Sequence, residues 1–140
     1  MVDVLRQKGR PYLFSNSIAP AVVGASLEVF DMLATSKDLI KNLRKNTSHF
    51  RTQMKKAGFK ILGHDDCPIA PVYLGDAKLA GEMSNLLMQN HNIYVIGFSF
   101  PVVPKGQARI RCQLSGAHTS AQIDETVAAF TKVGKDLKVI

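Results

Sequence analysis

Two arginines in the stretch ARIRCQL have a spacing that suits binding of an anion. Arg109 and Arg111 stand two positions apart, and Ile110, Cys112 and Leu114 alternate with them. Alternate residues of a strand face the same side, so both arginines are expected on one face and the apolar residues on the other. A guanidinium group stays charged and can hold a carboxylate by two parallel hydrogen bonds. The spacing leaves two interpretations open: arginines that face solvent, and arginines aimed at an anionic ligand.

A second polar stretch lies within residues 12–20 (YLFSNSIAP), between two apolar segments. Ser15, Asn16 and Ser17 precede Pro20, and proline often occupies the first position of a helix. Serine and asparagine side chains cap helices, which would account for their position. The alternative is a phosphate site, because hydroxyl and backbone N–H groups at a helix start bind anions. The residue types leave both interpretations open.

Other chemically active residue types occur at spacings that predict no site. The stretch GHDDCP at residues 63–68 contains metal-ligating residue types, but no second ligand pair follows at a zinc-finger spacing. We therefore expect a turn between two strands and no metal site. His118, in SGAHT, precedes a helix start and is expected to be a hydrogen-bonded or packed polar residue.

Hydrophobic periodicity and turn residues predict the elements that must position these side chains. Helices are expected from Pro20 to about Leu33, from the turn after Thr35 to Gly58, after Asp76 and after Thr119, and strands over 59–62, 69–74, 93–98 and 108–114. Pro71 places the second of these strands at an edge or a bulge. This order predicts an α+β fold with helices on one face of a small, mixed or antiparallel sheet.

The predicted helices differ in how much of their surface is apolar. Thr35 with Asp38, and Thr119 with Gln122, have the spacing of capping boxes that open amphipathic helices. The helix from Pro20 is instead apolar on nearly every face, which indicates packing on several sides. An isolated domain of this size would bury such a helix with difficulty, so this helix does not fit the predicted fold.

The composition limits the possible classes of protein. With 140 residues and 46% hydrophobic content, the chain is long enough for a domain with a core. Its net charge of +7 indicates anionic partners such as phosphates, coenzymes, nucleic acids or an acidic membrane face. Two distant cysteines, Cys67 and Cys112, predict no disulfide framework and a reducing compartment. No apolar run approaches the ~20 residues that cross a bilayer, so we expect a soluble chain.

Two long segments resemble a known enzyme family: RPYLFSNSIAPAVVGAS at residues 10–26 and PVVPKGQARIRCQLSGAHT at residues 101–119. Joined by GFKILG and IYVIGF, they resemble the pyridoxal-phosphate-dependent α-oxoamine synthases, in particular the 2-amino-3-ketobutyrate ligase branch. The resemblance implies a fold-type I aminotransferase-like enzyme (α/β by family) that is a homodimer with active sites at the subunit interface. It further implies that residues 1–35 belong to a large cofactor-binding domain and that residues 36–140 form the small C-terminal α+β domain.

The resemblance implies roles for three residues. Ser15 and Asn16 match positions that reach across the dimer to the phosphate of pyridoxal 5'-phosphate in the partner subunit. Arg111 matches the arginine that binds the carboxylate of glycine and of the amino-ketobutyrate product. Arg109 and His118 match the family without an implied role. The lysine that binds the cofactor covalently lies upstream in the family, so we expect no catalytic residue in this chain and no activity from it alone.

The implied activity interconverts glycine and acetyl-CoA with 2-amino-3-ketobutyrate and CoA in threonine breakdown. It requires no nucleic acid and no membrane, and it would be mitochondrial in a eukaryote and cytoplasmic otherwise. The charge leaves an alternative open, a basic α+β module that binds nucleic acid or a nucleotide. The strand ARIRCQL has no aromatic residues between its basic ones, which counts against a platform for stacking bases.

Overall fold

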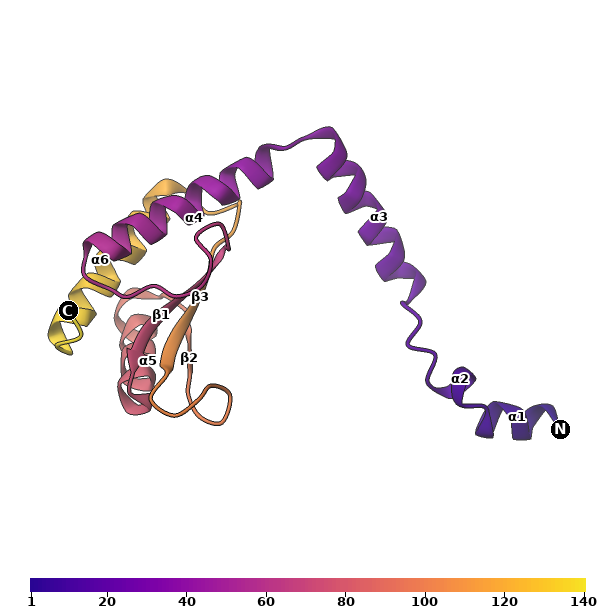
Figure 1. The fold of residues 1–140 in the computed structure, drawn as a ribbon. Helices are drawn as coiled ribbons and strands as arrows, with labels where there is room; N and C mark the ends of the chain where they lie inside the picture. Colours follow the sequence, from indigo (N-terminus) through magenta and orange to yellow (C-terminus); the bar gives the residue numbers. More distant parts are fainter. The chain divides into compact units, whose positions relative to one another are not determined.

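The computed structural model describes all residues from Met1 to Ile140 (Figure 1). The chain divides into two compact units, Met1–Lys37 and Asp38–Ile140. The first unit is helical, and the second combines three helices with a three-stranded sheet. None of the helices combines the length and the apolar character that crossing a bilayer requires.

The first unit contains the helices α1 (Val2–Lys8), α2 (Arg10–Leu13) and α3 (Pro20–Thr35). Helix α3 confirms the helix predicted from Pro20 and ends at Thr35 rather than at Leu33. Proline suits this start because its missing N–H has no partner in the first turn of any helix. Helices α1 and α2 were not predicted, since segments this short carry little periodic signal. None of the three helices contains a buried residue.

The predicted capping box between Thr35 and Asp38 is wrong. Thr35 is the last residue of α3, and its hydroxyl donates to the carbonyl oxygens of Asp31 at 2.9 Å and Met32 at 3.0 Å. The next helix begins at Asp38 itself, so Asp38 is not in the third helical position that a capping box needs. The threonine hydroxyl bonds to the preceding turn instead, which is the usual competing arrangement for this residue type.

The second unit contains, in chain order, α4 (Asp38–Lys56), β1 (Ile69–Gly75), α5 (Ala77–His91), β2 (Ile96–Phe98), β3 (Ala108–Gln113) and α6 (Ser120–Asp136). The strands form an antiparallel sheet in the order β1-β3-β2. The predicted α+β fold is confirmed. The strand predicted over 59–62 is wrong, because only a single bridge joins Ile61 to Val72, between turns at Gly58 and Gly63, whose φ angles are 103° and 80°.

The three helices of the second unit cover one face of the sheet. The core is built by Phe50 and Met54 from α4, Met83 and Leu87 from α5, Phe130 from α6, and Ala70, Val72, Ile110 and Cys112 from β1 and β3. The ring of Phe130 meets the rings of Phe50 and Phe59 edge to face, with centroids 6.4 and 6.1 Å apart. Because the buried strand residues alternate, the opposite face of the sheet carries Arg109 and Arg111 and is left uncovered.

Two helix starts in this unit match the sequence. Thr119 forms the predicted capping box, in which its hydroxyl accepts from the N–H of Gln122 at 3.2 Å and the Gln122 side chain accepts from the N–H of Thr119 at 2.9 Å. The side chain of Asp76 accepts from the N–H of Leu79 at 2.8 Å and caps α5. These caps satisfy backbone donors that would otherwise be unpaired at each helix start.

Candidate functional site

The strongest candidate site is the face of the sheet that no helix covers. Along β3, Ala108, Ile110 and Cys112 are buried, whereas Arg109 is half-buried and Arg111 is exposed. The prediction that both arginines share one face is therefore confirmed. Two cations beside one another on an open strand face repel each other unless an anion lies between or above them, which makes this face suitable for an anionic ligand.

Strand β2 presents an aromatic side chain to the same face. Gly97 points to the covered side, where an added Cβ would lie 3.1 Å from the carbonyl oxygen of Ala80 in α5. Its neighbours Ile96 and Phe98 therefore point to the uncovered side. In the antiparallel register, Ile96 is opposite Arg111 and Phe98 is opposite Arg109.

Three basic side chains on or beside this face each lie over an aromatic ring: Arg111 over Phe98 with Cζ at 4.7 Å from the ring centroid, Lys60 over Tyr73 with Nζ at 4.8 Å, and Lys105 over Phe100 with Nζ at 5.2 Å. The rings come from β1, β2 and the segment after β2, and none comes from β3. Aromatic and basic side chains are therefore interleaved across strands, which the pattern of ARIRCQL alone did not show. The alternation in IYVIGF and PVYLG is the signal that points to Phe98 and Tyr73.

The guanidinium group of Arg111 is free to bind a ligand. It makes no ion pair and no hydrogen bond anywhere in the chain, and its contact with the ring of Phe98 is its one polar or ring interaction. A guanidinium has five N–H donors in a rigid planar group, and two of them match the geometry of a carboxylate. The arrangement can therefore bind a carboxylate in a bidentate manner.

A buried arginine of α4 holds the start of β1. The Arg51 side chain is 3% exposed and donates to the carbonyl oxygens of Leu62 at 3.1 Å, Cys67 at 3.1 Å and Ile69 at 2.8 Å. Its carbonyl partners lie on both sides of the turn that precedes β1. Arg51 thus fixes this turn and strand start to α4 through hydrogen bonds to backbone carbonyl oxygens.

A buried asparagine of α4 holds the segment after β3 in the same way. The Nδ2 atom of Asn46 donates to the carbonyl oxygens of Ser115 at 3.0 Å and His118 at 2.7 Å. Since Ile69 at the start of β1 pairs with Gln113 at the end of β3, both contacts act at one end of the sheet. Neither residue was singled out from the sequence, because both sit among the polar residues of an amphipathic helix.

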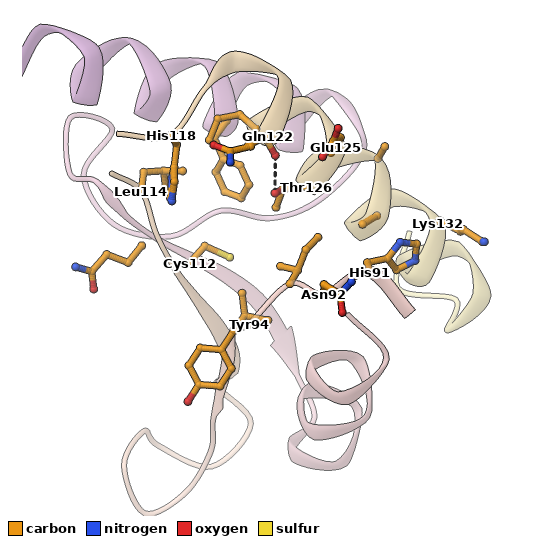
Figure 2. A pocket seen from close by; sticks show the side chains of 17 residues that line it. His91, Asn92, Tyr94, Cys112, Leu114, His118, Gln122, Glu125, Thr126 and Lys132 are labelled. Carbon is orange, nitrogen blue, oxygen red and sulfur yellow. Dashed lines mark hydrogen bonds between the residues drawn. The ribbon is translucent and has the colours of Figure 1, made fainter. Parts of the chain in front are cut away.

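A cavity of about 840 Å³ lies at this end of the sheet (Figure 2). The cavity is lined by residues 93–95, which precede β2, and by residues 112–114, at the end of β3. Both segments lie beyond the last pair that joins these two strands, Ile96 with Arg111. Helix α6 contributes Gln122 and Thr126, whose hydrogen bond of 2.7 Å runs along the helix. The cavity therefore opens where the pairing of β2 and β3 ends, and Arg111 does not line it.

Two reactive side chains that line this cavity, His118 and Cys112, have structural roles. The Nδ1 atom of His118 accepts a hydrogen bond from the N–H of Ser115 at 3.2 Å, which confirms the expected hydrogen-bonded polar residue. Burial raises the pKa of the Cys112 thiol to about 12, so the thiol stays protonated at neutral pH. A protonated buried thiol is a poor nucleophile, and Cys112 acts as part of the core.

The stretch GHDDCP forms the predicted turn before β1. The N–H of Cys67 donates to the carbonyl oxygen of His64 at 3.0 Å, which closes the turn. Asp65 accepts a hydrogen bond from the Lys55 ammonium at 2.8 Å. This hydrogen bond, together with the positive charge of Lys55, lowers the pKa of the Asp65 carboxyl. The turn is thus tied to α4 by an ion pair at the surface.

In the first unit, the polar stretch does not cap the helix that follows it. The N-cap of α3 is Ala19, which makes no side-chain cap hydrogen bond, so the helix-cap interpretation is wrong. Asn16 has φ of 51°, in the left-handed region that asparagine adopts more readily than most residues. The N–H of Ser17 donates to Oγ of Ser15 at 3.4 Å, and all three side chains are exposed. The Ser15 hydroxyl hydrogen and the Asn16 amide remain available as donors.

Solved structures with the same fold cover the whole chain. Serine palmitoyltransferase from S. paucimobilis, solved with a bound pyridoxal phosphate–myriocin aldimine, aligns with a TM-score of 0.83 and 29% identity over 99% of this chain and 35% of its own. An 8-amino-7-oxononanoate synthase from Francisella tularensis aligns with a TM-score of 0.75 and 24% identity over 99% of this chain and 40% of its own. The fold is that of the fold-type I pyridoxal-phosphate enzymes, as the resemblance implied.

Residues 1–130 match the family model described as aminotransferase class I and II, and the chain belongs to this family. It is 53% identical over 140 residues to 2-amino-3-ketobutyrate coenzyme A ligase of Escherichia coli K12, covering 100% of this chain and 35% of the relative. The human mitochondrial ligase is 49% identical over 135 residues, covering 96% of this chain and 32% of the relative. The chain thus spans about a third of the length of these curated relatives.

Proposed function

We propose that the chain is the C-terminal part of a pyridoxal-phosphate-dependent glycine C-acetyltransferase. The enzyme would interconvert glycine and acetyl-CoA with 2-amino-3-ketobutyrate and CoA in threonine catabolism. The observation that carries the proposal is the 53% identity to the E. coli ligase over the whole chain. An 8-amino-7-oxononanoate synthase from Thermosipho melanesiensis is 42% identical over the same 140 residues. The higher identity favours the ligase activity over that of the related synthase.

In this proposal the two units belong to different domains of a longer protein. Residues 1–35 are part of the large cofactor-binding domain, and residues 36–140 form the small C-terminal domain. The absence of any buried residue from α1, α2 and α3 supports this division. A helix that is apolar on nearly every face belongs in the interior of a larger structure.

The donors of Ser15 and Asn16 fit the phosphate group of pyridoxal phosphate. Hydroxyl and amide N–H groups can bind a phosphate dianion without any change in their own protonation. Both side chains are exposed and neither caps α3, so they are available to a ligand outside their own unit. We assign them to the cofactor bound in the partner subunit of a homodimer. When bound, the cofactor supplies an electron sink for negative charge at the amino-acid Cα.

Arg111 would bind the carboxylate of glycine and of the amino-ketobutyrate product. Its guanidinium has no competing partner in the chain. A bidentate contact fixes the position and the rotation of the carboxylate. The amino-acid Cα is then held in place while its bond to the acetyl group forms or breaks.

The 140-residue chain alone is expected to have no acyltransferase activity. None of its lysines stands in the sequence context of the family's cofactor-binding lysine. Turnover of glycine and acetyl-CoA above background by the purified chain would contradict this expectation. For the whole enzyme, the names of the mammalian relatives support a mitochondrial location in a eukaryote.

Replacement of Arg111 in the full-length enzyme tests the proposed function. Arg111→Ala should weaken productive binding of glycine by about 2–5 kcal/mol, while pyridoxal phosphate stays bound. Arg109→Ala is the matched control, because it removes the same charge from the same strand face. The measurements are glycine kinetics and the absorbance of the bound cofactor. Equal kinetics for Arg111→Ala and the unmodified enzyme would refute the assignment.

The interleaved cations and rings support a second candidate function, binding of single-stranded nucleic acid by the uncovered sheet face. Aromatic rings stack with bases, and basic side chains contact the phosphates. A salt titration of binding to random-sequence single-stranded DNA tests it, because release of counterions makes such binding steeply salt-dependent. Absence of binding at low salt would remove this candidate and leave the acyltransferase proposal in place.

A further inference from the structure

The ring of Phe98 is the group against which the side chain of Arg111 is oriented. The Cζ atom of Arg111 lies 4.7 Å from the centroid of this ring. No carboxylate lies within ion-pair distance of the guanidinium, and no hydrogen bond fixes it. A long arginine side chain on an exposed strand face would otherwise sample many rotamers. The ring contact therefore selects among them.

The register of the sheet shows that this contact is specific to Arg111. Phe98 is directly opposite Arg109 on β3, whereas Arg111 is opposite Ile96. The Arg111 side chain nevertheless lies over the Phe98 ring, across the diagonal between neighbouring pairs. Diagonal neighbours on one face of an antiparallel sheet are within reach of aromatic and long side chains. Of the two arginines, only Arg111 makes a ring contact.

The contact leaves the hydrogen-bonding edge of the guanidinium free. The ring is not a conventional hydrogen-bond acceptor, and none of the guanidinium N–H groups has a hydrogen-bond partner in the chain. The side chain is thus held in place without the loss of a donor. A carboxylate approaching the edge of the guanidinium meets donors whose orientation is already set, which lowers the entropy cost of binding.

We propose that Phe98 is a positioning residue that holds the Arg111 guanidinium ready for the substrate carboxylate. This inference rests on the proposed role of Arg111 in binding glycine. Phe98 acts through the arginine and makes no contact with the substrate itself. Its contribution depends on a ring face, which tyrosine also has and which leucine, an apolar residue, lacks.

The first test compares variants of the full-length enzyme. Phe98→Leu should raise the KM for glycine about two- to fivefold, the range of an exposed cation–π contact, with kcat nearly unchanged. Phe98→Tyr should keep both parameters close to the unmodified values. Tyr94→Leu is the matched control, since Tyr94 is 76% exposed and lies over no cation. Equal KM values for Phe98→Leu and Tyr94→Leu, or an equal rise for Phe98→Tyr, would overturn the inference.

A double-mutant cycle separates positioning from a merely structural role. In an Arg111→Ala background, Phe98→Leu should have no further effect on the KM for glycine, because the group that it positions is already gone. A further rise of the same size in that background would overturn the inference while leaving the proposed function intact. If Arg111→Ala itself left the KM unchanged, the proposed role of Arg111 would fall, and this inference with it.

A second measurement needs no activity and uses the 140-residue chain. The Nε–H resonance of Arg111 should carry an upfield ring-current shift in a ¹⁵N-resolved NMR spectrum, because the group lies over the face of the Phe98 ring. Phe98→Leu should remove the shift and Tyr94→Leu should keep it. A resonance of Arg111 that is the same in the unmodified chain and in Phe98→Leu would refute the positioning contact directly.

Discussion

The two units of the chain contain similar apolar residues and use them in opposite ways. In Met1–Lys37 the Phe30 side chain is 68% exposed and no helix has a buried residue. In Asp38–Ile140 the Phe130 side chain is fully buried between two other rings. Helix α3 has apolar residues on nearly every face, whereas α4 and α6 each turn one apolar face to the sheet. An apolar helix makes a core only when other elements supply the surface that it packs on.

Apolar content and core formation are separate properties of a sequence. The second unit supplies a complete interior from its own helices and sheet. The first unit leaves large apolar side chains exposed along α3, among them Val22, Leu27, Phe30 and Met32. Contiguous exposed apolar surface of this kind marks a surface that another structure covers, which agrees with its proposed place in a larger domain.

The largest expected effect on stability distinguishes Phe130 from Phe30. Phe130→Ala should lower the free energy of unfolding by about 3–5 kcal/mol, because it removes a fully buried ring and leaves a cavity. Phe30→Ala, the matched control in the first unit, should change it by less than about 0.5 kcal/mol. Urea denaturation followed by circular dichroism measures both. Similar losses from the two substitutions would contradict the expected difference between the two units.

The buried arginine of α4 should give the next largest effect. Arg51→Ala should cost about 3 kcal/mol of unfolding free energy, since it leaves the carbonyl oxygens of Leu62, Cys67 and Ile69 without their donor. Arg44→Ala, on an exposed position of the same helix, should cost little. The same denaturation measurement applies. If Arg44→Ala were as costly as Arg51→Ala, the effect would come from helix charge rather than from the buried contacts.

A smaller effect is expected in the pH dependence of the second unit. The hydrogen bond and charge of Lys55 lower the pKa of the Asp65 carboxyl in the folded chain. The ionised carboxylate therefore stabilises the fold at pH values above its unfolded pKa. This stabilisation is lost as the pH falls through the folded pKa. Asp65→Asn should remove that part of the acid sensitivity. Asp66→Asn is the control, since Asp66 lies 3.9 Å from His64 and contacts no lysine. Urea midpoints measured between neutral and acidic pH would show a steeper fall for the unmodified chain and for Asp66→Asn.

The smallest expected effect on stability comes from removing the first unit. A chain that begins at Ala34 should keep the unfolding free energy of the second unit within about 0.5 kcal/mol, because no core residue lies in the removed part. It should also self-associate less, since the exposed apolar helix is gone. Denaturation and light scattering measure the two quantities. Loss of the cooperative transition on truncation would show that the second unit depends on the first.

Most of the second unit could be predicted from the sequence because its elements repeat with a clear period. Alternation in ARIRCQL placed Arg109 and Arg111 on one face, and the spacing of Thr119 and Gln122 identified the start of α6. The failures lie where two local patterns compete. Thr35 bonds to the preceding turn of α3 instead of capping the next helix.

The ring contacts of the sheet face could not be predicted because they depend on strand pairing. Phe98 and Arg111 belong to different strands, and their contact follows from the register of β2 against β3. A pattern within one strand carries no information about the diagonal neighbour on the next. The buried contacts of Asn46 and Arg51 were missed for a related reason, since their partners are backbone carbonyls of distant segments.

Arg111 stands at the last position where β2 and β3 are paired. From Arg109 to Arg111, strand β3 pairs with both β1 and β2, whereas Cys112 and Gln113 pair with β1 alone and line the cavity together with residues 93–95. The strand is therefore held by two neighbours up to Arg111 and by one neighbour after it. A load applied to the segment after β3 would bend the strand at this arginine, so a tilt there would change the direction in which its guanidinium points.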